Sequence, residues 1–461
     1  MKIIFKEDKK DIKDALFVSI NSTNKDEIVR ENGIKTLYLK CDEVKKMNLR
    51  KFYLLVRKMV MTAKSIKAKK IAFNFVDFKF KNIKITDEEL GENIGTQLDF
   101  ANYEFTEYKT KPKEGFNFIQ EIIISGANKE IEKAILKGHT IASEVNKTRT
   151  LANTPGGDMT PKILAEKAKE AVKNLAVKVM VLGEKEMEKQ NMRAILSVGR
   201  GSDEESKFIV MEYNGGKKTD KPIVLVGKGV TFDSGGINLK PSNAMAGMNM
   251  DMSGGAAVIH TLALIAKMKL KKNVVGLIPA VENMISGKSY RTGDVIHSMS
   301  GKTIEILNTD AEGRVILADA LTYSQKYKPE VVVDVATLTS SSMSALGEKA
   351  SALLTKDDNL AEIFQKTGEK TGEYLWRLPL WDEYEEDIKG SLGDLTNLNN
   401  KKSPYGDVIY SSVFLYQFIK DFKWVHLDIA PRMVSIAGEN LAVGALGTPV
   451  RLLYKFIEEY K

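Results

Sequence analysis

This sequence of 461 amino acids has little cysteine and no long apolar run, and each absence excludes a class of protein. Cys41 is the single cysteine, so an internal disulfide is excluded and we expect a reducing, cytoplasmic environment. The sequence contains no apolar run close to the roughly 20 residues that span a membrane. Its first residues, MKIIFKEDKK, turn charged too early to hold the apolar core of a signal peptide. These absences predict a cytoplasmic protein.

Length and composition are those of a globular protein with more than one domain. Hydrophobic residues make up 43% of the chain and charged residues 28%, as is typical of soluble proteins. The net charge of +8 lies entirely in residues 1–150, which hold 30 Lys and Arg against 22 Asp and Glu; the remainder holds 39 of each. A basic region can bind an anionic partner such as DNA. Because acids are interleaved with the lysines and no binding motif accompanies them, we favour a lysine-rich solvated surface.

Alternating strand and helix patterns predict an α/β fold with two α/β domains. Residues 1–130 form a basic N-terminal accessory domain. Residues 131–150 continue a helical pattern that ends at the turn sequence TPGGDMTP, and we interpret them as a connecting helix. Residues 151–461 form the second domain, where several strands are continuously apolar, which predicts a mostly parallel or mixed sheet sandwiched by helices. Its expected strands include KFIVMEYN, PIVLVG, NVVGLIPAV, KTIEIL and EVVVDVATLT.

Charged residues gather at the ends of two of these strands, where ligands bind in sheets of this kind. The loop after PIVLVG and the sequence NTDAEGR after KTIEIL contain Lys228, Asp233, Lys240, Asp251, Asp310, Glu312 and Arg314. One interpretation of NTDAEGR is a simple helix N-cap, because two acids suit a first helical turn. The rest of the chain favours a chemical role.

Two other interpretations of the loop after PIVLVG are weaker. Gly227 and Gly229 begin a G-x-G phosphate-binding pattern, but Phe232 stands where the third glycine is needed, and the P-loop pattern fails as well. The sequence FDSGG resembles the surroundings of a serine nucleophile, yet such a serine needs a base beside it. The histidines, none in an informative context, are His139, His260, His297 and His426.

A metal site built on oxygen ligands accounts for these residues better. The carboxylates of Asp233, Asp251, Asp310 and Glu312 would repel one another at one edge of a sheet unless cations neutralised them. Two divalent ions roughly 3.5–4 Å apart, bridged by shared carboxylates, would remove that repulsion and bind a water between them. The two lysines of the loop could serve as ligand or electrophile, because a neighbouring cation drives off the lysine proton.

With these segments in view, the sequence resembles the cytosolic leucyl aminopeptidase family of dinuclear metallopeptidases. The segments VGKGVTFDSGGINLKP, MNMDMSGGAAV and NTDAEGRVILADAL are similar to that family's hallmark segments, and so are the intervals between them. The likeness runs from about residue 146 to the C-terminus, whereas the first 130 residues carry little of it. The resemblance implies that 151–461 is a catalytic metallopeptidase domain that hydrolyses the N-terminal residue from peptides.

The resemblance also implies which residues hold metal. Lys228, Asp233, Asp251 and Glu312 would hold a tighter ion, and Asp233, Asp310 and Glu312 a more exchangeable one. The exchangeable ion would bind the free α-amine of the substrate, and the water bridging both ions would be the nucleophile. Zinc or manganese is the expected metal, with cobalt and magnesium as alternatives.

Further residues would act on the substrate and on the proton. The resemblance implies that Lys240 polarises the scissile carbonyl and that Arg314 holds a bicarbonate ion that shuttles the proton, helped by the backbone of Leu338. The pocket for the first residue would accept an apolar, leucine- or methionine-like side chain. Its expected wall consists of Met248, Asn308 and Thr337.

The resemblance also bears on the assembly and partners of the protein. Its members are generally homo-hexamers with active sites facing an inner cavity, and some bacterial members also bind DNA. The family's HLDIAG is HLDIAP here, so Pro431 replaces a glycine near the rim of the pocket. A different two-metal hydrolase, such as a phosphatase, is another alternative, although such sites generally lack the paired lysines and the arginine of NTDAEGR.

Overall fold

A computed structural model gives the structure of the protein and describes all residues except 8–13, 22–24, 32, 42–43, 402 and 404. The chain divides into two compact units: Met1–Asn146 with Ser435–Gly444, and Lys147–Val434 with Ala445–Lys461. The division at residue 146 falls inside the long helix α3 (Lys129–Asn153). The boundaries proposed from sequence instead end the connecting helix at 150 and keep 435–444 in the second domain. Within the described residues, no helix is long and apolar enough to cross a membrane.

The first unit is built on a six-stranded sheet with the order β1-β6-β5-β2-β4-β3. Among the described strands, only β3 runs antiparallel to its neighbour. The strands are β1 (Lys2–Lys6), β2 (Leu16–Asn21), β3 (Glu27–Glu31), β4 (Ile34–Lys40), β5 (Lys70–Asn74) and β6 (Glu121–Ser125). Helices α1 (Leu49–Ser65) and α2 (Asp87–Asn102) pack against each other, because each carries a buried apolar stripe at helical spacing, for example Phe52 and Val56 on α1.

The second unit is built on a large mixed sheet with the order β16-β15-β18-β14-β9-β11-β8-β7, and β10 pairs with β11 beyond that path. The central strands β18, β14, β9 and β11 are mutually parallel, and β8 runs antiparallel to β11. The strands are β7 (Val177–Leu182), β8 (Lys207–Asn214), β9 (Ile223–Gly227), β10 (Gly229–Asp233), β11 (Asn273–Asn283), β14 (Val331–Ala336), β15 (Ser351–Leu354), β16 (Leu375–Arg377) and β18 (Trp424–Asp428).

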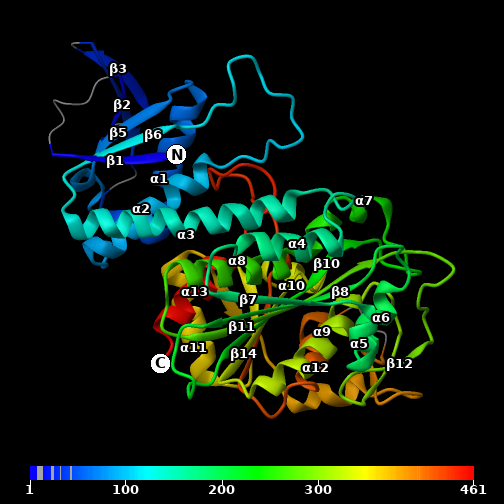
Figure 1. Cartoon of the computed structure of the whole chain (residues 1–461). Coiled ribbons are helices and arrows are strands. Elements are labelled where there is room, and N and C mark those ends of the chain that lie inside the picture. The colour runs from blue at the N-terminus through cyan, green and yellow to red at the C-terminus, as the bar shows by residue number, and fades with distance from the viewer. Residues whose placement is uncertain (8–13, 22–24, 32, 42–43, 402, 404) are drawn as a thin grey trace. The chain divides into compact units, whose positions relative to one another are not determined.

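Helices cover both faces of this sheet (Figure 1). On one face α8 packs on β9, β11 and β14 and is contacted by α4 and α13. On the other face α9 packs on β9 and β11 beside α6 and α12. The helices are α4 (Pro161–Ala171), α5 (Glu184–Lys189), α6 (Arg193–Gly199), α7 (Ser242–Met245), α8 (Ser253–Lys267), α9 (Glu312–Ser324), α10 (Ser340–Leu346), α11 (Asp358–Thr371), α12 (Asp407–Tyr416) and α13 (Val450–Glu459).

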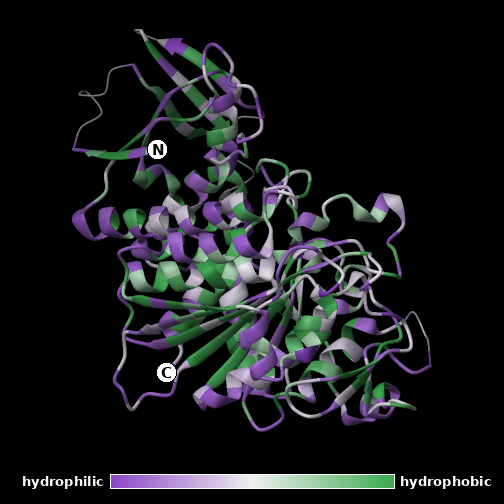
Figure 2. Ribbon diagram, turned by 45° about the vertical axis from the view of Figure 1, so that its right-hand side comes forward, coloured by the Kyte–Doolittle hydropathy of each residue, from purple (hydrophilic) through white to green (hydrophobic). Residues whose placement is uncertain are grey.

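The burial of the central strands explains their sequence. Every residue of β9, β14 and β18 is buried, and Figure 2 shows hydrophobic colouring running along the central strands. A strand with helices on both faces has no solvated side, so apolar residues stand at successive positions rather than at alternate ones. The predicted α/β class, with a mixed sheet between helical layers, is confirmed.

One expected strand of the large sheet is not part of it. The apolar run KTIEIL contributes only β13 (Thr303–Glu305), which pairs with β12 (Val295–His297) and β17 (Leu395–Thr396) in a separate three-stranded sheet. Its isoleucines, Ile304 and Ile306, are buried in the core that also contains α9. The run is therefore apolar because it packs under a helix, and the prediction that it belongs to the main sheet is wrong.

Candidate metal centre

Charged residues from four separate segments meet at the ends of β9 and β10. Lys228 lies between these two strands, and Asp233 is the last residue of β10. Asp251 lies in the 3-10 turn Met248–Met252 directly before α8. Asp310 precedes α9, and Glu312 is the first residue of that helix. All of them except Asp310, which is partly exposed, are buried.

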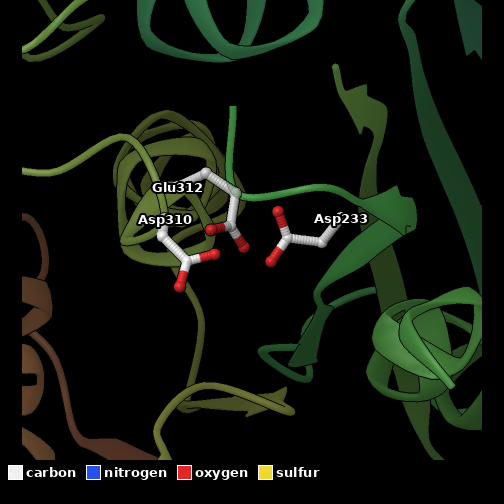
Figure 3. A group of neighbouring side chains, drawn as sticks. All are labelled: Asp233, Asp310 and Glu312. Atoms are coloured by element: carbon white, nitrogen blue, oxygen red, sulfur yellow. The ribbon is translucent and has the colours of Figure 1, made fainter. Parts of the chain in front are cut away.

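Three of the carboxylates point toward one another. Figure 3 shows Asp233 reaching from its strand toward Asp310 and Glu312 at the start of α9. One oxygen from each carboxylate can be chosen so that all three lie within 4.8 Å of one another. Oxygen atoms at this spacing can share one cation, and carboxylates are ligands of both hard and borderline divalent metals.

The ammonium group of Lys228 lies between the carboxylates of Asp251 and Glu312. Its Nζ is 2.7 Å from Glu312 Oε1, 2.8 Å from Asp251 Oδ1 and 2.7 Å from Asp251 Oδ2, and it donates to the carbonyl of Thr337. Burial alone would lower the pKa of Lys228, but Asp251, Glu312 and Asp233 raise it above its usual value. Without metal, these carboxylates therefore favour the ammonium form of Lys228.

Lys240 occupies the equivalent place beside the other pair of acids. Its Nζ is 2.8 Å from Asp233 Oδ2 and 2.5 Å from Asp310 Oδ1. The loop that carries Lys240 folds back on β10, because its backbone N–H donates to the carbonyl of Ser234. Gly235, with φ +89°, makes this return, and a Cβ there would lie 2.6 Å from the carbonyl oxygen of Asn238.

The cluster contains more acidic groups than basic groups. With every group ionised, four carboxylates would exceed two ammonium groups by two negative charges in a largely buried site, and burial also raises the pKa of Asp251. The pKa of Glu312 is raised by burial and then by Asp233, and the pKa of Asp310 is raised to about 6 by burial and then by Asp233 and Glu312. Glu312 Oε2 is buried and has no hydrogen-bond partner among the described residues. These features fit a donor set for divalent metal, which would restore the charge balance.

The glycine inside NTDAEGR is explained by a close approach. A Cβ on Gly313 would lie 2.6 Å from Lys228 Cε, 2.8 Å from Lys228 Nζ and 2.9 Å from Leu338 Cδ1. At such distances Lys228 or Leu338 would have to shift, and Lys228 is held in place by its ion pairs with Asp251 and Glu312. The glycine therefore lets α9 begin directly against Lys228, which brings Glu312 within ion-pair distance of it.

Arg314, on the first turn of α9, is paired with a residue that sequence reasoning did not single out. Its two terminal nitrogens donate to the two oxygens of Asp407, each at 2.8 Å, and Nη1 also donates to the carbonyl of Asn397. Its Nε is buried and has no partner among the described residues. The end of the guanidinium is thus occupied, and the edge that includes Nε keeps an unused donor.

The backbone donor of Leu338 is not free for an anion. Its N–H donates to Asp428 Oδ1 at 3.1 Å, in the segment that follows β14. Asp428 is buried and its second oxygen accepts from Thr339 Oγ1. The backbone N–H of Leu338 is therefore not available to bind bicarbonate as expected. The Nε donor of Arg314 is still without a partner among the described residues.

Two of the expected pocket residues contact the cluster, and the third lies on the turn that carries Asp251. Thr337 Oγ1 donates to Asp251 Oδ1 at 2.7 Å, so its hydroxyl is turned to the carboxylate. Asn308 Oδ1 accepts from the backbone N–H of Asp310 at 2.8 Å and fixes the turn before α9. Met248 begins the 3-10 turn that carries Asp251 and is partly exposed. Their contact with a substrate side chain stays a prediction.

Several neutral residues around the cluster were missed by sequence reasoning. Asn283, the last residue of β11, donates to Asp233 Oδ1 at 2.8 Å and to the carbonyl of Thr309 at 2.9 Å. Tyr290 donates to the same carbonyl at 2.6 Å. Asn397 donates to the carbonyl of Asn308 at 2.6 Å. Asn283 alone had a signal in sequence, because it is a polar residue that ends a long apolar strand.

The alternative interpretations of these segments find no support in the geometry. Ser234, the serine of FDSGG, is buried and donates its hydroxyl to the carbonyl of Asn283 at 2.7 Å. In NTDAEGR the N-cap position of α9 is Ala311, which makes no side-chain cap hydrogen bond. The acids on either side of it face Lys228 and Lys240 instead. Neither a serine nucleophile nor a simple helix cap describes this arrangement.

The chain is similar to several known proteins over most of its length. The profile described as "Cytosol aminopeptidase family, catalytic domain" matches residues 146–454. A "Probable cytosol aminopeptidase" of Azoarcus sp. (strain BH72) is 47% identical over 392 residues, which are 82% of this chain and 77% of that protein. A protein of the same name from Geobacter sulfurreducens is 42% identical over 370 residues, 79% of this chain and 74% of that protein. Among solved structures, "Bottromycin maturation enzyme BotP in complex with Mn" is similar with a TM-score of 0.87 and 28% sequence identity, over 96% of this chain and 99% of that one.

Proposed function

Because the chain belongs to the cytosol aminopeptidase family and is a metal-dependent hydrolase of the leucyl aminopeptidase type, we propose that it releases the first residue of small peptides with a free N-terminus. A peptide with an apolar, leucine- or methionine-like first residue is the preferred substrate, since Met248 begins the turn that carries Asp251. The observation that carries the proposal is the largely buried group of four carboxylates and two lysines, in which acidic groups outnumber basic ones.

Lys228, Asp233, Asp251, Asp310 and Glu312 are the residues that would hold two divalent ions, zinc or manganese by preference. Bound there, the ions would bind the substrate's amine and lower the pKa of a water that attacks the peptide bond. Lys228 has to lose its proton to become a ligand, because only a neutral amine has a lone pair to give. Thr337 and Asn283 keep Asp251 and Asp233 in place through neutral hydrogen bonds.

Lys240 acts on the substrate. Burial alone would lower its pKa, but Asp233 and Glu312 raise it above the usual value, so the ammonium form persists. Its Nζ lies between the carboxylates of Asp233 and Asp310. A fixed ammonium at this place can donate to the scissile carbonyl and stabilise the negative charge that develops on its oxygen.

Arg314 supplies the place for a planar anion. The buried Nε donor, which has no partner among the described residues, supports binding of bicarbonate along the edge of the guanidinium. Bicarbonate held there would take the proton from the attacking water and pass it to the leaving amine. Such a role suits this cluster, because Lys240 is held in its ammonium form and the carboxylates would be bound to metal, which leaves no base among them.

Release of leucine from a leucyl anilide tests the proposal. Metal-stripped protein should be inactive, protein refilled with Mn²⁺ or Zn²⁺ should be active, and Glu312→Ala should stay inactive after refilling. Glu330→Ala, which changes an acid paired with Lys423 away from the cluster, is the matched control and should keep full activity. Fully loaded wild-type protein without turnover on peptides or anilides would overturn the proposed function.

Assembly and location belong to the same proposal. We expect a homo-hexamer in the cytoplasm, and light scattering on the purified chain measures the assembly directly. A mass of six chains, each of 51.3 kDa, is the expected result. DNA binding by the basic first third is supported by no motif in the sequence and is not part of the proposal.

A further inference from the structure

Asn283 links two of the segments that carry the carboxylates of the cluster. It is fully buried and is paired with Asp233 in the parallel register of β10 and β11. One hydrogen of its amide goes to Asp233 Oδ1 at 2.8 Å, and the other goes to the carbonyl oxygen of Thr309 at 2.9 Å. A single neutral side chain therefore binds both the end of β10 and the loop before α9.

The carbonyl of Thr309 is held from a second side. The hydroxyl of Tyr290, also fully buried, donates to it at 2.6 Å. Thr309 directly precedes Asp310, so the peptide group that leads into Asp310 is fixed by two donors. The same loop is fixed further by the side chain of Asn308, which accepts from the N–H of Asp310.

The hydrogen bonds also settle which oxygen of Asp233 is available. Oδ1 accepts from Asn283 and from the backbone N–H of Gly235, at 2.8 and 2.9 Å. Oδ2 is the oxygen that faces Lys240 and the other carboxylates. Two donors on one oxygen orient the second oxygen of the carboxylate toward the cluster.

We propose that Asn283, supported by Tyr290, is a positioning residue that sets the metal affinity of the pair Asp233 and Asp310. The inference rests on the proposed function, because it takes these carboxylates as metal ligands. Asparagine is suited to the task because it offers two donors and no charge. An acid here would add negative charge to the cluster, and an apolar residue would leave Asp233 Oδ1 and Thr309 O each short of one donor.

The other side of the cluster has a separate support, which makes the proposal selective. Thr337 Oγ1 donates to Asp251 Oδ1, and its carbonyl accepts from Lys228. Both hydrogen bonds that the Asn283 amide donates go to Asp233 and Thr309, on the opposite side from Lys228 and Asp251 in the hydrogen-bond network of the described residues. Loss of Asn283 should therefore weaken the ion held by Asp233 and Asp310 more than the ion held by Lys228 and Asp251.

The test compares metal binding by the full-length protein and three variants. Competition with a chromophoric chelator gives the two dissociation constants for Mn²⁺, independently of any peptide. Asn283→Ala should raise the dissociation constant of the more weakly bound ion about 10- to 100-fold. Tyr290→Phe, which removes one of the two donors to Thr309, should raise it on the order of fivefold.

Asn273→Ala is the matched control, because Asn273 begins the same strand, β11, at its other end. Its amide donates to the carbonyls of Lys217 and Asp220, away from the carboxylates, so its loss should lower stability without changing either metal constant. Urea unfolding of all variants separates a general loss of stability from an effect on the site. If Asn283→Ala does not fold, the Tyr290→Phe variant decides the matter alone.

Unchanged metal constants in Asn283→Ala, or an equal change in Asn273→Ala, would overturn the inference. In the fallback case, unchanged constants in Tyr290→Phe would do so. These outcomes are distinct from failure of the proposed function. Wild-type protein that binds Mn²⁺ but hydrolyses no peptide would contradict the aminopeptidase proposal, and the comparison of metal constants would still stand.

Discussion

Arg314 and Asp407 form a bidentate ion pair, with both terminal guanidinium nitrogens 2.8 Å from the two carboxylate oxygens. The pair joins the first turn of α9 to the first residue of α12. Because Asp407 neutralises the guanidinium, an anion at the free edge that includes Nε is attracted less strongly than by an unpaired arginine. The activity of the enzyme should depend on this pair.

We predict that Asp407→Asn lowers the bicarbonate concentration needed for half-maximal activity by about tenfold. The substitution removes one negative charge beside Arg314 and retains an oxygen that can accept from it. Initial rates measured against bicarbonate in carbonate-free buffer give the value. Asp382→Asn, which changes an exposed acid paired with Lys356, serves as the control. A bicarbonate dependence equal to that of wild type would refute the link between the pair and the anion.

Metal binding should release a proton from Lys228. Burial lowers the pKa of Lys228, but the surrounding carboxylates raise it by more than burial lowers it. The protein without metal therefore carries an ammonium there at neutral pH. A proton must leave before the amine can bind metal, and the apparent metal affinity should therefore fall as the pH is lowered. Calorimetry in two buffers of different ionisation enthalpy counts the released proton. Lys228→Met should lose it and Lys240→Met should keep it; the reverse pattern would exchange the roles of the two lysines.

Removal of Lys240 should affect the rate far more than metal binding. In Lys240→Ala the donor to the substrate carbonyl is lost, and we expect kcat to fall about 100- to 1,000-fold. Both metal ions should still bind, because the carboxylates are unchanged. Steady-state kinetics with saturating Mn²⁺, together with a metal count by atomic absorption, separates the two effects. A variant that lost its metal in proportion to its activity would show that Lys240 holds the site together instead.

The close approach at Gly313 gives a prediction on stability. A methyl group there would collide with Lys228 and Leu338, so Gly313→Ala should lower the free energy of unfolding by about 1–3 kcal/mol and reduce metal occupancy. Urea denaturation and a metal count measure both. Gly157→Ala is the control, since nothing lies within 4 Å of the added methyl group and its backbone is not in the left-handed region. Equal effects of the two substitutions would contradict the steric argument.

In the first unit, His139 should make stability depend on pH. Its Nδ1 is hydrogen-bonded to Asp99 Oδ2, and this bond, opposed in part by burial, raises the pKa of His139 above 6.5. The folded protein thus favours the protonated ring. The resulting stability is fully present below about pH 6.5 and is lost as the pH rises through the folded pKa. The urea concentration at the midpoint of unfolding should decrease as the pH is raised from 6 to 9, and His139→Gln should make this decrease smaller. An identical decrease in the variant would point to other groups.

The large sheet and the charged cluster were accessible from sequence for a clear physical reason. A strand such as PIVLVG is apolar throughout because helices cover both its faces, so Lys228 and Asp233 directly after it stand out. The polar residues that hold the loop before α9 and Arg314 do not stand out in this way. Asn397 and Asp407 lie in polar segments and reach α9 and its loop across more than 80 residues of sequence. The run KTIEIL misled the strand assignment because an apolar side is needed under a helix as much as in a sheet.

The kinds of atom in the cluster have a consequence for metal choice. Among the described residues the converging donors are carboxylate oxygens and lysine nitrogens, with neither thiolate nor imidazole. Thiolates and imidazoles are the ligands that favour zinc and copper strongly, whereas oxygen donors are also suited to manganese and magnesium. We therefore expect the ion found in the cell to follow its abundance there, so that the same chain changes its rate with the metal content of the growth medium.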